Sequence, residues 1–501
     1  MKNYIIALDQ GTTSSRALLI DKAGQVRGVA QSDFPQHFPQ PGWVEHDPKE
    51  ILSSQLSVLT ELLVAQRVTL DEIDSIGITN QRETTIVWDR TTGEPVYNAL
   101  VWQCRRTTDL VERVCGNEEI SAEITRRTGL IPDAYYSASK IAWILNEVEG
   151  ARERAEAGDL LFGTVDTWLI WNLTHGAVHA TDPTNASRTM LFDIHTGTWD
   201  PWLCGLFGIP MSILPEVRPS SGYFGNLHHP VYKGEVPICG VAGDQQAALF
   251  GQGCLEEGQA KATFGTGCFL LMHTGTQASI STHGLVATRA ASLPDVSHFD
   301  YALEGSVFMA GALMQWLRDG LGLVDNVAES NALAQSVPDT NGVYVVPAFT
   351  GLGAPYWDAD ARGAIYGLTR GANKRHVVRA CLEAQAYQVY DVLRAMIDDS
   401  AVSLTSLMVD GGACRNDFMM QFCADILQVD IIRPRIVETT ALGVAYLAGL
   451  SSGFWANRAE IALLRSIERT FHPAMDDLNR KKLLHGWKEA IWRTKSDQPS
   501  L

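Results

Sequence analysis

The sequence predicts an α/β protein of two domains. Apolar stretches rich in β-branched residues alternate with amphipathic helical stretches along the chain, which is typical of mixed sheets covered by helices. The 501 residues exceed the roughly 250–300 at which a single hydrophobic core stops growing. We place the boundary near residue 250, in the glycine-rich stretch FGQGCLEEG, so that the predicted domains are residues 1–250 and 251–501.

The first half contains four segments with clear local patterns. Residues 4–21 (YIIALDQGTTSSRALLID) predict a strand, a turn of small residues and a second strand. Residues 45–66 predict a helix, with Asp47 as N-cap, Pro48 at the first position and Glu50 at the third. Residues 74–89 predict a short buried strand, a polar break and another strand, and residues 237–253 a strand that passes through a turn into a helix.

The second half shows the same kinds of element. Residues 256–275 predict a strand, a glycine turn and a strand, and residues 373–399 an amphipathic helix. Residues 403–428 predict a strand, a DGG turn and a helix. Asp9-Gln10-Gly11 and Asp410-Gly411-Gly412 each place an acid and glycine at the end of an apolar strand. This similarity suggests two related domains, each giving one phosphate-facing turn to a shared cleft.

Composition excludes several classes of protein. The net charge of −17 argues against general affinity for nucleic acid. The chain has no uninterrupted apolar run of about 18 residues, so we expect no membrane span, and its N-terminus does not resemble a secretory signal. The nine cysteines are odd in number and scattered, without a C-x-x-C, which argues against a disulfide scaffold or a zinc site and favours a reducing cytoplasm.

Three small-residue turns could bind phosphate: DQGTT, FGTG and VDGGA. Glycine lets the backbone come close to a ligand, and the hydroxyls of Thr12, Thr13 and Ser14 add to the exposed N–H groups. In isolation an ordinary hairpin is the slightly favoured alternative for the first turn. No Walker-type G-K-[ST] and no protein-kinase motif set occurs, so ATP binding would need another architecture. Any metal is expected to be Mg²⁺ held by carboxylates, water and phosphate.

The sequence alone leaves two interpretations open for each of several other residues. Arg82 and Glu83 could converge on one polar ligand, or could belong to a surface loop. Asp244 could be the N-cap of the following helix, or a base aimed into a cleft. Trp102 and Phe269 could form apolar walls of a site, or pack in the core.

Taken together, the motifs resemble the FGGY carbohydrate kinase family. They include ALDQGTTSSR, GITNQRETTIVW, VWQCRR, TDPTNASRTMLF, GVAGDQQAALFGQ, FGTGCF, ARGAIYGLTRG and VDGGACRN, and they run in order from residue 4 to about 450. The combination of TNQRETT with GDQQ is similar to the glycerol-phosphorylating members rather than the sugar and aldonate kinases.

The resemblance implies a fold and an activity. The fold would be a two-domain actin-like and Hsp70-like ATPase (ribonuclease H-like) fold with a deep interdomain cleft. The activity would be transfer of a phosphoryl group from MgATP to glycerol, in glycerol catabolism in the cytoplasm, by a homodimer or homotetramer. Asp244 would be the general base that accepts the proton of the attacking hydroxyl.

The resemblance also assigns site residues, position by position. Asp9 and Asp244 would lie near Mg²⁺, through water. Glycerol would be bound by Arg82, Glu83, Trp102, Tyr135, Asp244, Gln245 and Phe269. The nucleotide would be bound by Thr12, Thr13, Ser14, Arg16, Thr266, Gly311, Gln315, Gly412 and Asn416.

Two departures and two alternatives remain at this point. The loop NLHHPVYKGEVPICG lacks the glycine-rich basic loop by which some bacterial members bind fructose 1,6-bisphosphate, and FHPAMDDLNRKK differs from the segment that docks a sugar-transport phosphocarrier, so neither control is expected. The alternative activities are phosphorylation of another sugar or polyol by an FGGY kinase, and an actin- or Hsp70-like ATP-dependent clamp whose ligand is a protein.

Overall fold

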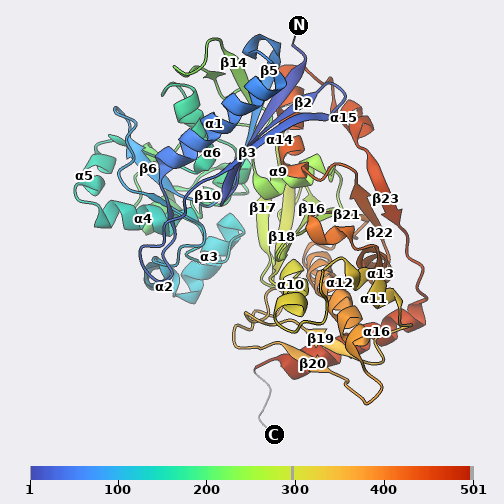
Figure 1. Cartoon of the computed structure of the whole chain (residues 1–501). Helices are drawn as coiled ribbons and strands as arrows, with labels where there is room; N and C mark the ends of the chain where they lie inside the picture. The colour runs from blue at the N-terminus through green and yellow to red at the C-terminus, as the bar shows by residue number, and fades with distance from the viewer. Residues whose placement is uncertain (1, 295–297, 497–501) are drawn as a thin grey trace.

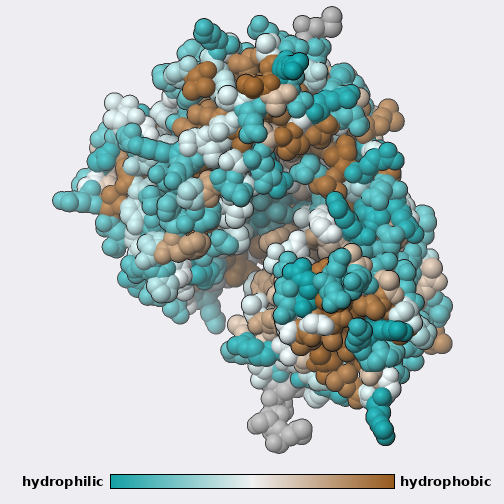
Figure 2. All heavy atoms as spheres, viewed as in Figure 1, coloured by the Kyte–Doolittle hydropathy of each residue, from teal (hydrophilic) through white to brown (hydrophobic). Residues whose placement is uncertain are grey.

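The computed structural model describes residues 2–294 and 298–496. The chain forms two lobes, each built around one mixed β-sheet with helices packed on it (Figure 1). The surface is hollowed between the lobes (Figure 2). The predicted two-domain α/β fold is confirmed.

The sheet of the first lobe has the strand order β13-β14-β5-β1-β2-β3. Its centre is the predicted hairpin, in which β1 pairs antiparallel with β2, while β5 lies parallel to β1 on the other side. The strands are β1 (Tyr4–Gln10), β2 (Ser14–Asp21), β3 (Val26–Asp33), β5 (Ile73–Asn80), β13 (Asn226–Leu227) and β14 (Val236–Gly243).

Helices cover both faces of this sheet. On one face, α1 (Pro48–Gln66) and α6 (Val165–Leu173) pack against side chains such as Ile6, and on the other α14 (Thr439–Ser452) packs against side chains such as Ile5. This is why β1 reads as a continuous apolar run rather than an alternating one. The N-cap of α1 is Asp47, which accepts a hydrogen bond from Lys49 N at 2.8 Å, as predicted.

The sheet of the second lobe has the strand order β17-β18-β16-β15-β21-β22-β23. It repeats the first sheet: β15 and β16 form an antiparallel hairpin, and β21 and β22 follow in parallel on the other side of β15. Its long covering helix is α12 (Lys374–Ser400). The strands are β15 (Gln259–Phe264), β16 (Cys268–Gly275), β17 (Val286–Arg289), β18 (Tyr301–Val307), β21 (Ser406–Asp410), β22 (Asp430–Pro434) and β23 (Ile467–Phe471).

This correspondence corrects one pairing made from the sequence. The counterpart of the Asp9-Gln10-Gly11 turn, which joins β1 to β2, is the FGTG turn that joins β15 to β16. The Asp410-Gly411-Gly412 turn instead follows β21, and it corresponds to the turn after β5. The error arose because an acid and glycine at a strand end do not reveal which strand of the sheet is ending.

The helix α9 (Asp244–Gly251) lies between the lobes. It packs tightly on α14, because a Cβ at Gly443 would lie only 1.9 Å from the carbonyl oxygen of Ala247. Its other side contacts the second sheet, where Leu249 packs with Leu271 of β16. Helix α9 is therefore held by both lobes.

The other helices and short strands complete the two lobes around these layers. The helices are α2 (Thr108–Cys115), α3 (Glu118–Thr128), α4 (Ser137–Glu147), α5 (Ala151–Glu156), α7 (Pro183–Ala186), α8 (Pro201–Phe207), α10 (Gly311–Asp319), α11 (Glu329–Gln335), α13 (Asp417–Leu427), α15 (Arg458–Leu464) and α16 (Asp477–Thr494). Short strands include β4 (Glu45–His46), β6 (Ile86–Asp89), β7 (Ala99–Leu100), β8 (Leu160–Gly163), β19 (Tyr344–Val346) and β20 (Ala364–Tyr366). No helix among the described residues is both long enough and apolar enough to cross a membrane.

Candidate active site

Arg82 and Glu83 are buried side by side in the turn between β5 and β6. Each is only 2% exposed, so the surface-loop reading of this segment is wrong. Arg82 Nε lies 3.5 Å from Glu83 Oε1 and 3.2 Å from Asp244 Oδ1. The structure thus brings together three of the predicted polyol-binding residues, with donor and acceptor groups facing one another.

Asp244 is the first residue of α9 rather than its N-cap. Gly243 holds the cap position, and its N–H is bound by Thr184 Oγ1 at 2.8 Å, so the N-cap reading of Asp244 is wrong by one residue. Burial in the cleft raises the pKa of Asp244; Arg82 opposes this shift and Glu83 adds to it. About a third of the side chain is still exposed (35%), so the carboxylate can be reached by a ligand. A raised pKa is what a group that takes up a proton near neutral pH needs.

Aromatic side chains border this cluster. The rings of Trp102 and Tyr135 meet edge to face with centroids 5.5 Å apart. The indole Nε1 of Trp102 donates to Thr12 Oγ1 at 2.9 Å, so the wall is joined to the first phosphate turn. Trp102 is not a core residue, since it is only partly buried.

Phe269 and Gln245 bring the second lobe into the site. Phe269 is 37% exposed and projects from the same face of β16 as Leu271, whose side chain packs against α9. Gln245 Oε1 accepts a hydrogen bond from Lys261 Nζ on β15. The start of α9 is thus tied to the second sheet through Gln245 and Lys261.

The first phosphate turn is compact. Gly11 N donates to Ser14 O at 3.0 Å, which closes the loop that joins β1 to β2, and Thr12 and Thr13 form its tip. Arg16, on β2, forms an ion pair with Glu438 at 3.1 Å, with both side chains about one-third exposed. The turn therefore offers backbone N–H groups and hydroxyls, with one guanidinium beside them.

Four of the residues predicted to bind nucleotide gather at the corresponding end of the second sheet. Gly311 N and Ala310 N, at the start of α10, donate to Gly265 O and Thr266 O of the FGTG turn at 3.0 Å. A Cβ at Gly311 would lie 2.5 Å from Gly265 O, so the close approach requires glycine. Gly412 follows β21, and Asn416 caps α13 by accepting from Met419 N. Gln315 is exposed one turn along α10.

Asp9 lies near the end of β1, beside the first phosphate turn. Burial raises its pKa to about 7, Arg16 opposes the shift, and the nearby carboxylate of Asp244 adds to it. Two carboxylates that repel each other beside a phosphate turn are a suitable oxygen donor set for Mg²⁺. No group of three or more His, Cys, Asp or Glu able to hold a metal occurs within residues 2–294 and 298–496, so a cation would also need water and phosphate oxygens.

Three buried charged residues of the site were missed from the sequence. Arg188 (1% exposed), Lys261 (0%) and Glu304 (7%) lie in direct contact with Glu83, Gln245 and Arg82. The signal available in the sequence was a single charge within an otherwise apolar strand, as in QAKATF and YALEGSVF. Such a residue is rarely buried without a charged or polar partner.

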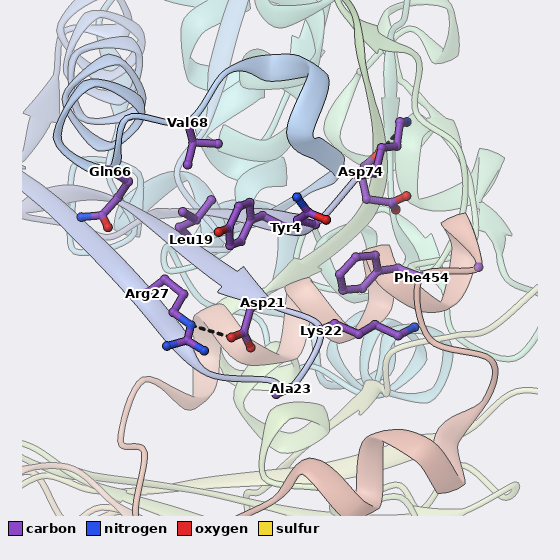
Figure 3. A pocket seen from close by; sticks show the side chains of 13 residues that line it. Tyr4, Leu19, Asp21, Lys22, Ala23, Arg27, Gln66, Val68, Asp74 and Phe454 are labelled. Carbon is purple, nitrogen blue, oxygen red and sulfur yellow. Dashed lines mark hydrogen bonds and ion pairs between the residues drawn. The ribbon is translucent and has the colours of Figure 1, made fainter.

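A hollow of about 860 Å³ lies away from this cluster (Figure 3). Tyr4 and Asp21 line it, at the opposite ends of β1 and β2 from the phosphate turn. Tyr4 and Gln10 are six residue steps apart along β1, which corresponds to about 20 Å. Its Arg27 and Asp21 already pair with each other at 2.5 Å. The hollow is therefore separate from the candidate active site.

Comparison with known proteins assigns the family. The profile of the FGGY family of carbohydrate kinases, N-terminal domain, matches residues 4–251, and that of the C-terminal domain matches residues 260–452. The chain belongs to this family. A protein of Lachnoclostridium phytofermentans named glycerol kinase is 58% identical to this chain, and the match covers 98% of this chain and 98% of that protein. A protein of Carboxydothermus hydrogenoformans with the same name is 56% identical, and the match covers 99% of this chain and 98% of that protein.

Solved structures of the family have the same fold. The Plasmodium falciparum glycerol kinase with ADP superposes with a TM-score of 0.94 at 39% identity, covering 98% of each chain. The gluconate kinase from Lactobacillus acidophilus superposes with a TM-score of 0.87 at 22% identity, covering 99% of this chain and 98% of that one. The second likeness concerns the fold alone.

Proposed function

We propose that this chain transfers the γ-phosphoryl group of ATP to a terminal hydroxyl of glycerol, forming sn-glycerol 3-phosphate. The observation that carries the proposal is the buried cluster of Arg82, Glu83 and Asp244 beside the turn at Thr12. Relatives named glycerol kinase at up to 58% identity over nearly the whole chain support the choice of glycerol. The ADP named with the Plasmodium falciparum enzyme supports an adenine nucleotide as the donor.

In this proposal the acceptor cluster orients the polyol. Glu83 accepts hydrogen bonds from hydroxyls and Arg82 donates to them, while Trp102, Tyr135 and Phe269 bound the carbon chain. Gln245, next to the base and tied to Lys261, supplies a further polar contact. Asp244 accepts the proton of the terminal hydroxyl of glycerol. The oxygen of that hydroxyl attacks the γ-phosphorus of ATP, and ADP leaves.

The nucleotide spans the two lobes. The phosphate chain is bound by the hydroxyls and backbone of Thr12, Thr13 and Ser14 from the first lobe and by Thr266 from the second. Arg16 adds its guanidinium to the phosphates. The adenosine and the phosphates next to it are bound by Gly311, Gln315, Gly412 and Asn416. Phosphoryl transfer depends mainly on alignment and charge stabilisation, which a site closed by both lobes provides.

Mg²⁺ fits beside Asp9 and Asp244, where it would be held through water and the nucleotide phosphates. It would neutralise part of the charge of the transferred phosphoryl group. Burial is the main cause of the raised pKa of Asp9, and the nearby carboxylate of Asp244 adds to it.

The biological setting is part of the same proposal. The boundary near residue 250, a homodimeric or homotetrameric state and a role in cytoplasmic glycerol catabolism follow from the resemblance to the family. All nine cysteines are buried and free, which is consistent with a reducing compartment.

The test measures ADP release by the purified chain with MgATP, with glycerol or with a panel of sugars and polyols as acceptor. We expect strong turnover with glycerol and a loss of about 10²–10⁴-fold in the Asp244→Asn variant, with unchanged thermal unfolding. Higher kcat/KM on another polyol would retain the mechanism and change the substrate. ATP hydrolysis stimulated by polypeptide and indifferent to polyols would favour the clamp.

A further inference from the structure

The donor groups of Arg82 are shared between a partner in the other lobe and the open part of the site. Arg82 Nη1 and Nη2 donate to the two oxygens of Glu304 on β18, at 2.6 and 2.9 Å, and Nη1 also donates to Gln246 Oε1 at 3.1 Å. The Nε–H side instead faces Asp244 and Glu83. A two-pronged contact of this kind fixes the plane of a guanidinium as well as its position.

Arg188 extends the contact to Glu83. Its Nε donates to Glu83 Oε1 at 2.7 Å, and its Nη2 donates to Glu304 Oε1 at 3.2 Å. Arg188 also lies over the ring of Tyr136, 5.5 Å from its centroid. The carboxylate of Glu304 therefore bridges the guanidinium groups of Arg82 and Arg188, and through Arg188 it is linked to Glu83.

The charges of this network balance around Glu304. Arg82 and Arg188 are positive, and both of them, like Glu304, are nearly excluded from water. Although burial disfavours its charge, Arg188 and Arg82 lower the pKa of Glu304 to about 2, so it is ionised throughout the physiological range. Without this carboxylate, the two guanidinium groups would repel each other and would have only Glu83 and Asp244 left to neutralise them.

We propose that Glu304 is a positioning residue for the phosphoacceptor site: from the second lobe it holds Arg82 directly, and Glu83 through Arg188. This inference rests on the proposed function, since it assigns the acceptor site to Arg82 and Glu83. In the absence of the Glu304 charge, Arg82 turns toward Asp244 and Glu83 and occupies the acceptors that the polyol and its proton need. The acceptor site is thus complete only when β18 lies against the first lobe.

The test compares steady-state kinetics of the full chain with Glu304→Gln, which keeps the shape and removes the charge, and Glu304→Asp, which keeps the charge on a shorter arm. We expect Glu304→Gln to lower kcat/KM for glycerol about 100-fold, as breaking a buried charge pair does, with KM for ATP changed less than about twofold. Glu304→Asp should recover part of the loss. Arg188→Lys, tested in parallel, should also raise KM for glycerol selectively.

A matched control is Glu383→Gln. Glu383 is also a buried glutamate of the second lobe and accepts from Arg379 Nε at 2.8 Å, but it lies on α12, away from the cluster. It should leave both KM values unchanged.

The outcomes separate the two proposals. A wild-type chain without glycerol-dependent turnover overturns the proposed function. The positioning role is overturned if the wild-type chain phosphorylates glycerol but the variants keep the wild-type KM for glycerol. It is also overturned if the variants lose affinity for ATP as much as they lose affinity for glycerol. If thermal unfolding shows that Glu304→Gln is not folded, the charge-retaining variants Glu304→Asp and Arg188→Lys are used instead. A higher KM for glycerol with an unchanged KM for ATP then supports the positioning role, and an unchanged KM for glycerol overturns it.

Discussion

The indole N–H of Trp102 donates to the hydroxyl oxygen of Thr12 at 2.9 Å, joining the aromatic wall of the acceptor cluster to the tip of the first phosphate turn. The two residues come from different parts of the first lobe, 90 positions apart in the chain. The contact sets the spacing between the place where we expect the polyol and the place where we expect phosphate.

Replacing Trp102 by Phe tests that contact, because it keeps an aromatic ring and removes the donor. We expect a loss of roughly fivefold in kcat/KM for glycerol, since a neutral hydrogen bond contributes about 1 kcal/mol. Steady-state kinetics with varied glycerol would measure it. The matched control is Trp168→Phe, which removes a buried indole hydrogen bond from α6 to Pro48 O at the start of α1; it should lower stability and leave the kinetics unchanged. Equal kinetics for wild type and Trp102→Phe would contradict the prediction.

The pH dependence of turnover should report Asp244. A general base must be deprotonated, so kcat/KM for glycerol should fall as the pH falls through its pKa. Because burial raises that pKa, the fall should begin above pH 3.8, the ordinary value for an aspartate. A profile of kcat/KM for glycerol against pH, at saturating MgATP, would locate this fall. The residual activity of Asp244→Asn should not show the fall at low pH. A flat profile down to pH 4 would speak against the assignment.

Substitutions of the adjacent Gly411 and Gly412 should have different effects, the first on the stability of the fold and the second on nucleotide binding. Gly411 has φ +87°, and a Cβ there would lie 2.4 Å from Phe264 O, so Gly411→Ala should destabilise the chain by about 3 kcal/mol. A Cβ at Gly412 meets nothing within 4 Å, so Gly412→Ala should fold normally and raise only KM for ATP. Denaturant unfolding and kinetics would measure both. A Gly412→Ala variant with unchanged KM for ATP would remove Gly412 from the proposed nucleotide site.

Stability should fall in mild acid because of His46. Its Nε2 lies 2.7 Å from Gln36 Oε1 and its Nδ1 lies 3.4 Å from Gln81 Nε2, an arrangement that suits a neutral ring donating from Nε2 and accepting at Nδ1. Burial lowers its pKa from 6.5 to about 4. A lowered pKa means that its contribution is complete above pH 6.5 and is lost as the pH falls toward 4, by up to about 3 kcal/mol.

Denaturant unfolding of the wild type and of His46→Gln between pH 7.5 and 4 would measure this contribution. The wild type should be the more stable at pH 7.5, and the difference should shrink below pH 6.5. A constant difference between wild type and His46→Gln would assign the acid sensitivity to other groups.

Local patterns predicted the elements well where packing agreed with them. The hairpin at residues 4–21 and the helix capped by Asp47 form as expected, because turn and capping chemistry act within a few residues. The assignment of equivalent turns failed, because strand order in a sheet depends on contacts distant in sequence.

The candidate site was only partly accessible to sequence reasoning. From the residues alone, Arg82 and Glu83 fit a surface loop as well as a buried one, and their burial depends on Arg188 and Glu304, more than 100 positions away. Motif resemblance supplied the residues that would touch ligands. It did not supply the charges behind them, because a motif does not state which partners a buried ion requires.

The helix α14 belongs to the second half of the chain, yet it covers one face of the first sheet, where a Cβ at Gly77 or Gly240 would meet the backbone of Val444 or Ala448. A fragment cut near residue 250 would therefore leave the apolar residues Ile5, Ala7, Leu18 and Ile20 uncovered. Such a fragment would aggregate when expressed alone, whereas co-expression with the remainder of the chain would restore a soluble pair. The two lobes are units of architecture and of sequence similarity, but the first sheet has one of its faces covered by a helix that the second half of the chain supplies.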